Sequence, residues 1–207
     1  MPCPPPPENF TLTPKPAFSK GTRTFYRFNP AGYSSCLYFP RDKTFRFDDP
    51  DQSFGVLYAS VQPDGAFAET YGHDVTQLPN DDYKIISEHE LTLRHVFELH
   101  ITGLRLARFC GNGLATLNLD GNICTMPDYT VPQQWAKWVH QHTKGYDGII
   151  FHSRYLPTIE SIALFERAKK KVVNEMDLGI ALDFVHPRTG KTMEDILINQ
   201  GWGLVDA

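Results

Sequence analysis

Hydrophobic and polar residues alternate in several short stretches of the chain, which is the pattern of β-strands with two different faces. The clearest stretch is 55–61, where aliphatic residues alternate with Tyr58 and Ser60. Tyr58 is therefore predicted to point away from the aliphatic side of this strand. Similar patterns predict strands at 24–28, 90–97 and 103–109, and an apolar run predicts a short buried strand at 146–151.

One segment has clear helical spacing. Residues 131–140 carry a proline near the start and place Trp135, Trp138 and Val139 at positions i, i+3 and i+4. A proline is tolerated in the first turn of a helix, and an apolar stripe at this spacing is typical of a helix that packs on a core. Both tryptophans are therefore predicted to be core residues.

A second, shorter helix is predicted at 66–70, after the turn formed by residues 63–65. Asp64 is well placed to cap its N-terminus. Glu69 would then lie one turn into the helix, close to the end of the strand at 55–61. This mixture of strands and helices predicts an α+β fold with a mixed sheet.

The chain of 207 residues is long enough for one domain with a complete core. Residues 1–20 hold seven of the sixteen prolines, which predicts an extended, poorly ordered arm. The domain is therefore predicted to span 21–207. A weaker helical pattern lies at 194–197, and the sequence assigns no role to residues 167–207.

Composition and charge narrow the range of functions. The formal net charge of −4 argues against a nucleic-acid-binding role, because such proteins present a positive field. The four cysteines show no CxxC spacing, which favours reduced thiols in the cytoplasm. No stretch has the pattern of a signal peptide or the roughly 18 apolar residues of a membrane helix. We therefore expect a cytoplasmic protein without membrane association.

Several short sequence blocks occur in the order that one known family uses. They are Tyr26-Arg27-Phe28, Arg46-Phe47, Gly55-Val56-Leu57-Tyr58-Ala59, Ala66-Phe67-Ala68-Glu69, and Tyr146-Asp147-Gly148 to Ser153-Arg154, followed by Ala163-Leu164-Phe165. In this combination the chain resembles the RES-domain family, which is named after an arginine, a glutamate and a serine. The likeness covers roughly residues 22–166.

The resemblance implies a fold related to ADP-ribosyltransferases, with NAD bound in a cleft as the substrate. Characterised members of the family are toxins of bacterial toxin–antitoxin pairs that deplete NAD, and some transfer ADP-ribose to a protein. The antitoxin is usually a separately encoded DNA-binding protein that covers the active site. We therefore expect an antitoxin partner.

The residue types in these blocks suit the cleavage of NAD. A carboxylate such as Glu69 can stabilise the oxocarbenium-like cation that develops when the nicotinamide–ribose bond breaks. The planar guanidinium of Arg46, and secondarily that of Arg27, can bind the diphosphate through parallel hydrogen bonds. The ring of Tyr58 can stack on nicotinamide, and the hydroxyl of Ser153 can hydrogen-bond the ribose or the amide.

Each candidate also has a purely structural alternative. Arg46 could pair with Asp48 or Asp49, Tyr58 could be an ordinary sheet residue, and Glu69 could be a charge on a helix face. Ser153 could be a turn residue. Arg154, which follows it directly, could bind NAD or brace its loop.

The chain departs from the family pattern next to Arg46. Family members often have a glycine before the Arg-Phe pair and an asparagine after it, whereas this chain has Phe45 and Asp48. Both residues put the shape of the phosphate side of the cleft in doubt. Asp48 would also oppose an anionic ligand if its carboxylate pointed inward.

The histidines give no sign of a metal centre. His95, His100, His140, His142 and His152 lack a ligand spacing with acids or cysteines, so no metal is predicted.

Three functional hypotheses remain at this point. The leading one is an NAD glycohydrolase or phosphorylase, the second is a protein ADP-ribosyltransferase, and the third is a non-catalytic nucleotide-binding or partner-binding module. The sequence leaves open the acceptor, the identity of the antitoxin and the formation of a homodimer.

Overall fold

The computed structural model describes residues 3–18, 20–75 and 84–206. Its centre is a curled sheet of eight strands in the order β1-β6-β7-β8-β3-β2-β5-β9. The strands are β1 (Pro16–Phe18), β2 (Thr22–Pro30), β3 (Val56–Ser60), β5 (Arg94–Thr102), β6 (Arg105–Phe109), β7 (Gly148–His152), β8 (Glu160–Phe165) and β9 (Val172–Ile180). β6 and β7 are parallel, and the other neighbouring strands are antiparallel. The α+β class and the mixed sheet are thus confirmed.

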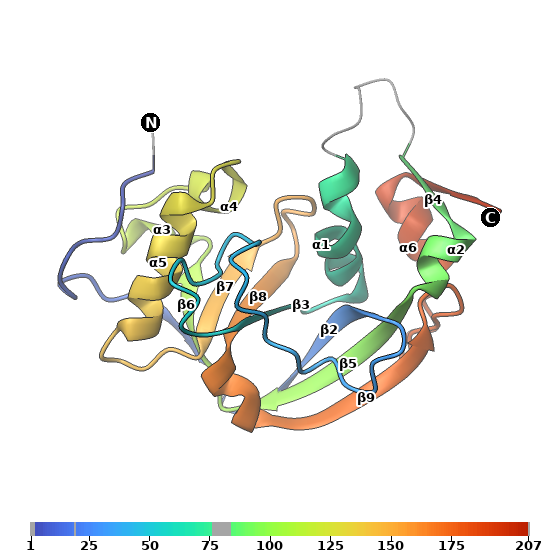
Figure 1. The fold of residues 1–207 in the computed structure, drawn as a ribbon, viewed down its shortest axis with the longest axis horizontal. Helices are drawn as coiled ribbons and strands as arrows, with labels where there is room; N and C mark the ends of the chain where they lie inside the picture. Colours follow the sequence, from blue (N-terminus) through green and yellow to red (C-terminus); the bar gives the residue numbers. More distant parts are fainter. Residues whose placement is uncertain (1–2, 19, 76–83, 207) are drawn as a thin grey trace.

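The helices stand in two groups on the sheet (Figure 1). The first group comprises α3 (Asn112–Ala115), α4 (Asn122–Thr125) and α5 (Thr130–Gln141), and the second comprises α1 (Pro63–Val75), α2 (Glu88–Thr92) and α6 (Met193–Gln200). A 3₁₀ helix, η1 (Glu166–Lys171), joins β8 to β9. A separate parallel pair is formed by β4 (Lys84–Ser87) and β10 (Trp202–Val205). In the second group α1 packs against β2 and β3, whereas in the first group α3 packs against β6 and α5 packs against β7.

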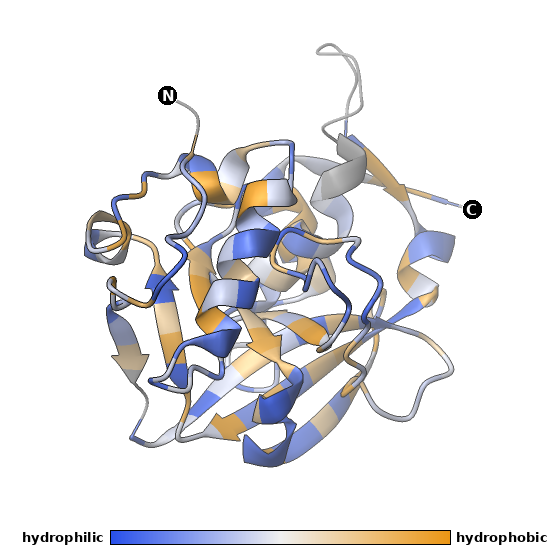
Figure 2. Cartoon of the chain, turned by 60° about the vertical axis from the view of Figure 1, so that its left-hand side comes forward, coloured by the Kyte–Doolittle hydropathy of each residue, from blue (hydrophilic) through white to orange (hydrophobic). Residues whose placement is uncertain are grey.

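The core covers both faces of the central strands, and the apolar segments of the sheet are visible in Figure 2. On β3, Val56 and Tyr58 pack on the side of α5, whereas Leu57 and Ala59 pack on the opposite side. The alternation in the sequence therefore separates two buried faces, and Tyr58 lies on the face away from Leu57 as predicted. None of the helices in the described ranges is long and apolar enough to cross a bilayer.

The predicted strand at 90–97 is wrong in its first part. Residues 88–92 form the short helix α2, and β5 begins only at Arg94. The hydroxyl of Ser87 caps this helix by accepting a hydrogen bond from the backbone N–H of Glu90 at 3.1 Å. A local cap of this kind satisfies an otherwise unpaired helix donor and overrides the alternation of side chains.

Asp64 also differs from its predicted role. The helix α1 begins at Pro63, two residues earlier than a cap at Asp64 requires, so Asp64 lies in its first turn. Its carboxylate forms an ion pair with Lys191, close to the start of α6. Asp64 therefore ties α1 to the C-terminal part of the chain.

Residues 3–18 of the proline-rich segment contact the rest of the domain through their backbone. Carbonyl oxygens of Pro4, Asn9 and Pro14 accept hydrogen bonds from Trp135, Trp138 and Tyr146, at 2.9, 3.3 and 2.6 Å. The segment then continues into β1 at the edge of the sheet. An extended proline-rich backbone has no internal hydrogen bonds, so its carbonyls are available to these buried donors.

Candidate active site

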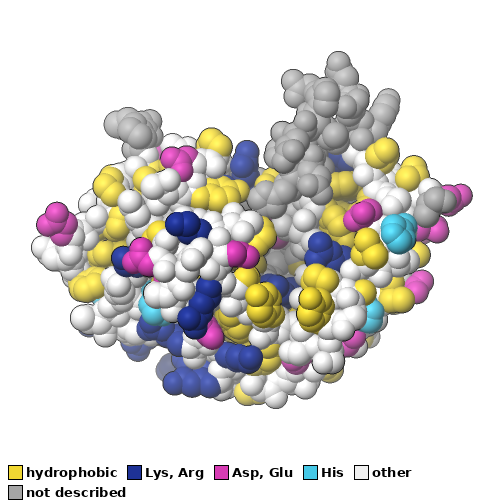
Figure 3. Space-filling model, viewed as in Figure 1, with side chains coloured by type: hydrophobic (Ala, Val, Ile, Leu, Met, Phe, Trp, Pro, Cys, Tyr) yellow, Lys and Arg dark blue, Asp and Glu magenta, His cyan; other side chains and the backbone are white. Residues whose placement is uncertain are grey.

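A cavity of about 630 Å³ lies between α1 and the segment that contains α4 and Tyr129, above β2 and β3. This volume is within the range of typical small-molecule sites. In Figure 3, Lys and Arg side chains lie around the hollow in the middle of this face. The cavity wall includes the sequence candidates Arg27, Arg46, Tyr58, Glu69 and Arg154. Ser153 is absent from this lining and lies just behind it.

Glu69 is held on α1, which approaches β3 closely. A Cβ atom on Gly65 would lie 2.1 Å from the Ser60 Oγ, so glycine is required for this approach. Within the described structure, the Oε1 atom of Glu69 is buried and has no hydrogen-bond partner. Burial raises the pKa of Glu69, against opposing effects of a hydrogen bond with Ser153 and the charge of Arg46. One carboxylate oxygen is thus desolvated and unpaired at the cavity wall.

Arg46 is largely buried on the opposite side of the cavity. Its Nη1 donates a hydrogen bond to the carbonyl oxygen of Met126 at 2.7 Å, and its guanidinium lies 4.6 Å from the centre of the Tyr129 ring. Burial lowers the pKa of Arg46. The alternative of an ion pair with Asp48 or Asp49 is not observed within the described residues. The carbonyl and the ring therefore orient a cation at the cavity.

The hydroxyl of Tyr58 is used by the protein itself. It donates to Asp48 Oδ1 at 3.0 Å and accepts from the backbone N–H of Phe47 at 2.8 Å. The other oxygen of Asp48 accepts from the N–H of Phe45 at 2.7 Å. Asp48 is 1% exposed and is absent from the cavity wall, and burial raises its pKa to about 6. The departure from the family's asparagine thus places no carboxylate in the cavity.

Ser153 forms a tight turn directly after β7. Its Oγ accepts hydrogen bonds from the backbone N–H groups of Tyr155 and Leu156, both at 3.2 Å. The hydroxyl is therefore left to donate to Glu69, in agreement with its lowering effect on the pKa of that carboxyl. The strand end that was predicted to deliver Ser153 does so, but the serine lies behind Glu69 and not on the cavity surface.

Arg27 and Arg154 complete the set of predicted candidates. Arg27 lies on β2, and its Nη1 donates to the carbonyl oxygen of Tyr58 at 3.0 Å. Its buried Nε has no hydrogen-bond partner in the part of the chain that the structure describes. Arg154 lies near the ring of Tyr155, at 5.8 Å from its centre. The two arginines thus border the cavity from the sheet and from the loop after β7.

The cavity wall includes residues that sequence reasoning missed, among them Arg94, Tyr129 and Tyr155. Tyr155 packs directly on α1, because a Cβ atom on Gly72 would lie 2.5 Å from its ring. Gly72 lies three residues after Glu69 and therefore on the same side of the helix. Gly72 lies beyond the helix predicted at 66–70 but inside the observed α1, so the sequence pattern carried no signal that another group approaches this face.

We expect Gly72→Ala to destabilise the protein, although alanine favours a helix over glycine by ~1 kcal/mol. The added methyl group collides with the Tyr155 ring and has to displace it. In a Tyr155→Ala background the collision is absent, so the same substitution should stabilise. Chemical denaturation of the four proteins measures this coupling, and equal effects of Gly72→Ala in both backgrounds would contradict the packing.

The comparison with protein families decides the identity of the fold. The model of the RES domain matches residues 13–185. The chain belongs to the RES-domain family. The match includes β1 and ends before α6 and β10. No curated protein matches the chain in sequence.

A solved structure is similar to this RES-domain chain in fold. The matching chain is part of the crystal structure of the MbcT–MbcA toxin–antitoxin complex of M. tuberculosis. The TM-score is 0.55 at 13% sequence identity, and the alignment covers 78% of this chain and 87% of the other. At this identity the similarity shows a common fold.

Proposed function

We propose that this RES-domain protein consumes NAD by cleaving the bond between nicotinamide and ribose. The observation that carries the proposal is the buried, unpaired carboxylate oxygen of Glu69 at the wall of a cavity lined with arginines. An unpaired buried oxygen is costly, so it is typical of a site that receives a ligand. Family membership supports NAD as that ligand.

In the proposed reaction, the bond from the ribose C1′ to the nicotinamide nitrogen breaks and its electron pair leaves with neutral nicotinamide. Positive charge then develops on the ribose. Glu69 stabilises this charge, and its effect is strong because the carboxylate is removed from water. Ser153 positions Glu69. The oxygen of an acceptor forms the new bond to C1′ and loses its proton to solvent or to the released product.

The arginines suit the negatively charged part of NAD. Arg46 is oriented by Met126 and Tyr129, and Arg27 by the carbonyl of Tyr58. A guanidinium with fixed orientation loses little conformational entropy when it binds a diphosphate. We assign diphosphate binding to Arg46 and Arg27, with Arg154 as a further contact at the loop after β7.

Tyr58 contributes its ring rather than its hydroxyl, because Asp48 and Phe47 already bind that hydroxyl. We expect Tyr58→Phe to lower the free energy of unfolding by about 1–3 kcal/mol, since it leaves buried polar groups of Asp48 and Phe47 unpaired. The variant keeps the ring that stacks on nicotinamide and should retain most of its activity. Tyr58→Ala should lose both stability and activity.

Steady-state kinetics on folded samples of the two Tyr58 variants, with denaturation curves in parallel, separate the two roles. If Tyr58→Phe is as inactive as Tyr58→Ala while still folded, the hydroxyl takes part in the reaction and the ring assignment is wrong.

We further propose that the protein acts as the toxin of a toxin–antitoxin pair. The fold is shared with a chain of the MbcT–MbcA toxin–antitoxin complex, and the cavity opens on the surface, where a partner can cover it. The partner is a separately encoded antitoxin. Toxicity is expected to depend on Glu69, so that induced expression lowers cellular NAD for the wild type and leaves it unchanged for Glu69→Gln.

NAD labelled in its adenosine part is used to identify the acceptor of the ADP-ribose group. After incubation with the purified protein in a cell lysate, free ADP-ribose indicates water, a phosphorylated ADP-ribose indicates phosphate, and label fixed on a protein indicates ADP-ribose transfer. The third outcome would replace the hydrolase or phosphorylase with a protein ADP-ribosyltransferase. NAD binding without any of these products would indicate a non-catalytic module.

A further inference from the structure

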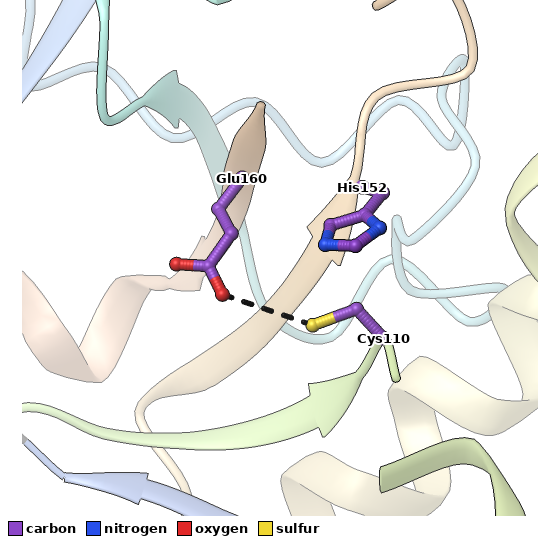
Figure 4. Close-up of side chains that lie close together, drawn as sticks. All are labelled: Cys110, His152 and Glu160. Atoms are coloured by element: carbon purple, nitrogen blue, oxygen red, sulfur yellow. Dashed lines mark hydrogen bonds between the residues drawn. The ribbon is translucent and has the colours of Figure 1, made fainter. Parts of the chain in front are cut away.

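Three metal-binding side chains from neighbouring strands meet at one edge of the sheet, outside the cavity. Cys110 follows the last residue of β6, His152 is the last residue of β7, and Glu160 is the first residue of β8. The register pairs Phe109 with Phe151 and His152 with Glu160, so the topology brings the three together. Figure 4 shows the three side chains close to one another.

We propose that Cys110, His152 and Glu160 form a Zn²⁺ site. One ligand atom from each residue lies within 4.8 Å of the other two. The Cys110 Sγ is 3.9 Å from the Glu160 Oε1. Bond lengths of ~2.3 Å to sulfur and ~2.0 Å to oxygen in a tetrahedral zinc site require a separation of about 3.5 Å. Small side-chain rotations therefore suffice to enclose an ion.

The donor set selects the type of metal. A thiolate, an imidazole and a carboxylate are the usual ligands of Zn²⁺, whereas Mg²⁺ and Ca²⁺ prefer oxygen alone. The three protein ligands leave a fourth position for water. Cys110 is buried, but His152 is exposed, so an ion can enter from solvent. The spacing of 110, 152 and 160 along the chain has no local motif, which explains why the sequence predicted no metal.

In the structure the guanidinium of Arg108 lies beside Cys110 and Glu160 and supplies a positive charge there. Its Nη1 lies 3.2 Å from the Glu160 Oε1 and 3.6 Å from the Cys110 Sγ. Its side chain is 32% exposed and can turn toward solvent when a metal ion replaces it. The guanidinium and Zn²⁺ thus compete for the same two groups. Removing the charge at residue 108 should strengthen metal binding.

The first test is titration of the reduced, chelator-treated full-length protein with Co²⁺, which replaces Zn²⁺ and gives a thiolate-to-metal absorption band. We expect the band to saturate at one equivalent and to disappear when Zn²⁺ is added. Cys110→Ser should abolish it, whereas Cys3→Ser, the matched control at a cysteine outside this group, should keep it.

Affinities from competition with a zinc chelator test the other two ligands. His152→Ala and Glu160→Gln should each weaken Zn²⁺ binding about tenfold or more. Arg108→Met keeps the apolar stem of the side chain and should bind Zn²⁺ several-fold more tightly than the wild type. Circular dichroism of each variant confirms that the fold is kept.

Two results of the Co²⁺ titration would overturn the site. One is the absence of a saturable Co²⁺ band in the wild type, and the other is a band that persists in Cys110→Ser. Equal Zn²⁺ affinity of the wild type and of both His152→Ala and Glu160→Gln would also refute it. None of the three ligands lines the cavity, so these readouts are independent of NAD cleavage.

Discussion

Glu69→Gln is expected to lower the rate of nicotinamide release by roughly 10³-fold, the order of magnitude seen when one group that stabilises transition-state charge is removed. Glutamine has nearly the same shape but no negative charge to stabilise the developing cation. Its amide still fits between Ser153 and the cavity, so the fold should be unchanged. The measurement is kcat for nicotinamide release by both proteins.

The same substitution should increase stability at neutral pH. Because the pKa of Glu69 is raised in the folded protein, folding binds protons between the ordinary carboxyl pKa of ~4.3 and the raised value. The free energy of unfolding therefore falls as the pH rises through this window. Glu69→Gln removes that loss, so the variant should be more stable than the wild type at pH ~7, and the difference should disappear below pH ~4.

Denaturation curves at the two pH values measure this effect, and Glu8→Gln, at an exposed position outside any helix, is the matched control. The control should change neither stability nor turnover. A Glu69→Gln protein that keeps its activity, or that loses stability at neutral pH, would show that the carboxylate is an ordinary structural group.

Arg46→Lys is expected to lower kcat/KM for NAD by roughly 10²-fold, which corresponds to the loss of a strong charge-assisted hydrogen bond. Lysine keeps the positive charge but cannot form two parallel hydrogen bonds. It also cannot stack on the Tyr129 ring while donating to the Met126 carbonyl as Arg46 does. The loss should appear mainly in KM, because the proposed contact is with the diphosphate and not with the reacting bond.

Arg23→Lys on β2 serves as the matched control, since Arg23 does not line the cavity. Its kinetics should equal those of the wild type. If Arg46→Lys leaves KM unchanged and strongly lowers kcat, Arg46 instead acts at the reacting bond.

Local sequence patterns predicted the elements that rely on their own side chains. The stripe of Trp135, Trp138 and Val139 needs burial on one side, and α5 provides it. The alternation in 55–61 gave β3 because each face of that strand is covered by a different part of the core. In contrast, the alternation at 90–97 overlaps the end of α2, the helix that Ser87 caps through a single hydrogen bond. The backbone carbonyls of the proline-rich segment accept hydrogen bonds from Trp135, Trp138 and Tyr146. Composition alone does not reveal these donors.

The candidate site was predictable only where residues occur in family motifs. Glu69, Arg46 and Tyr58 lie in such blocks, and the structure brings them to one cavity. Tyr129 and Tyr155 reach the cavity through loops, so their positions depend on the packing of α4 and α1. The surroundings of Ser153 also depend on the tertiary structure, because the turn that buries it points its hydroxyl at Glu69 rather than at the cavity.

The central claim is tested most directly by incubating purified wild-type protein with NAD and measuring free nicotinamide by chromatography over time, in buffers with and without phosphate. The account predicts catalytic release, with many molecules of nicotinamide per molecule of protein, in at least one of the two buffers. NAD that binds to the folded protein but stays intact in both buffers and in a cell lysate would contradict it.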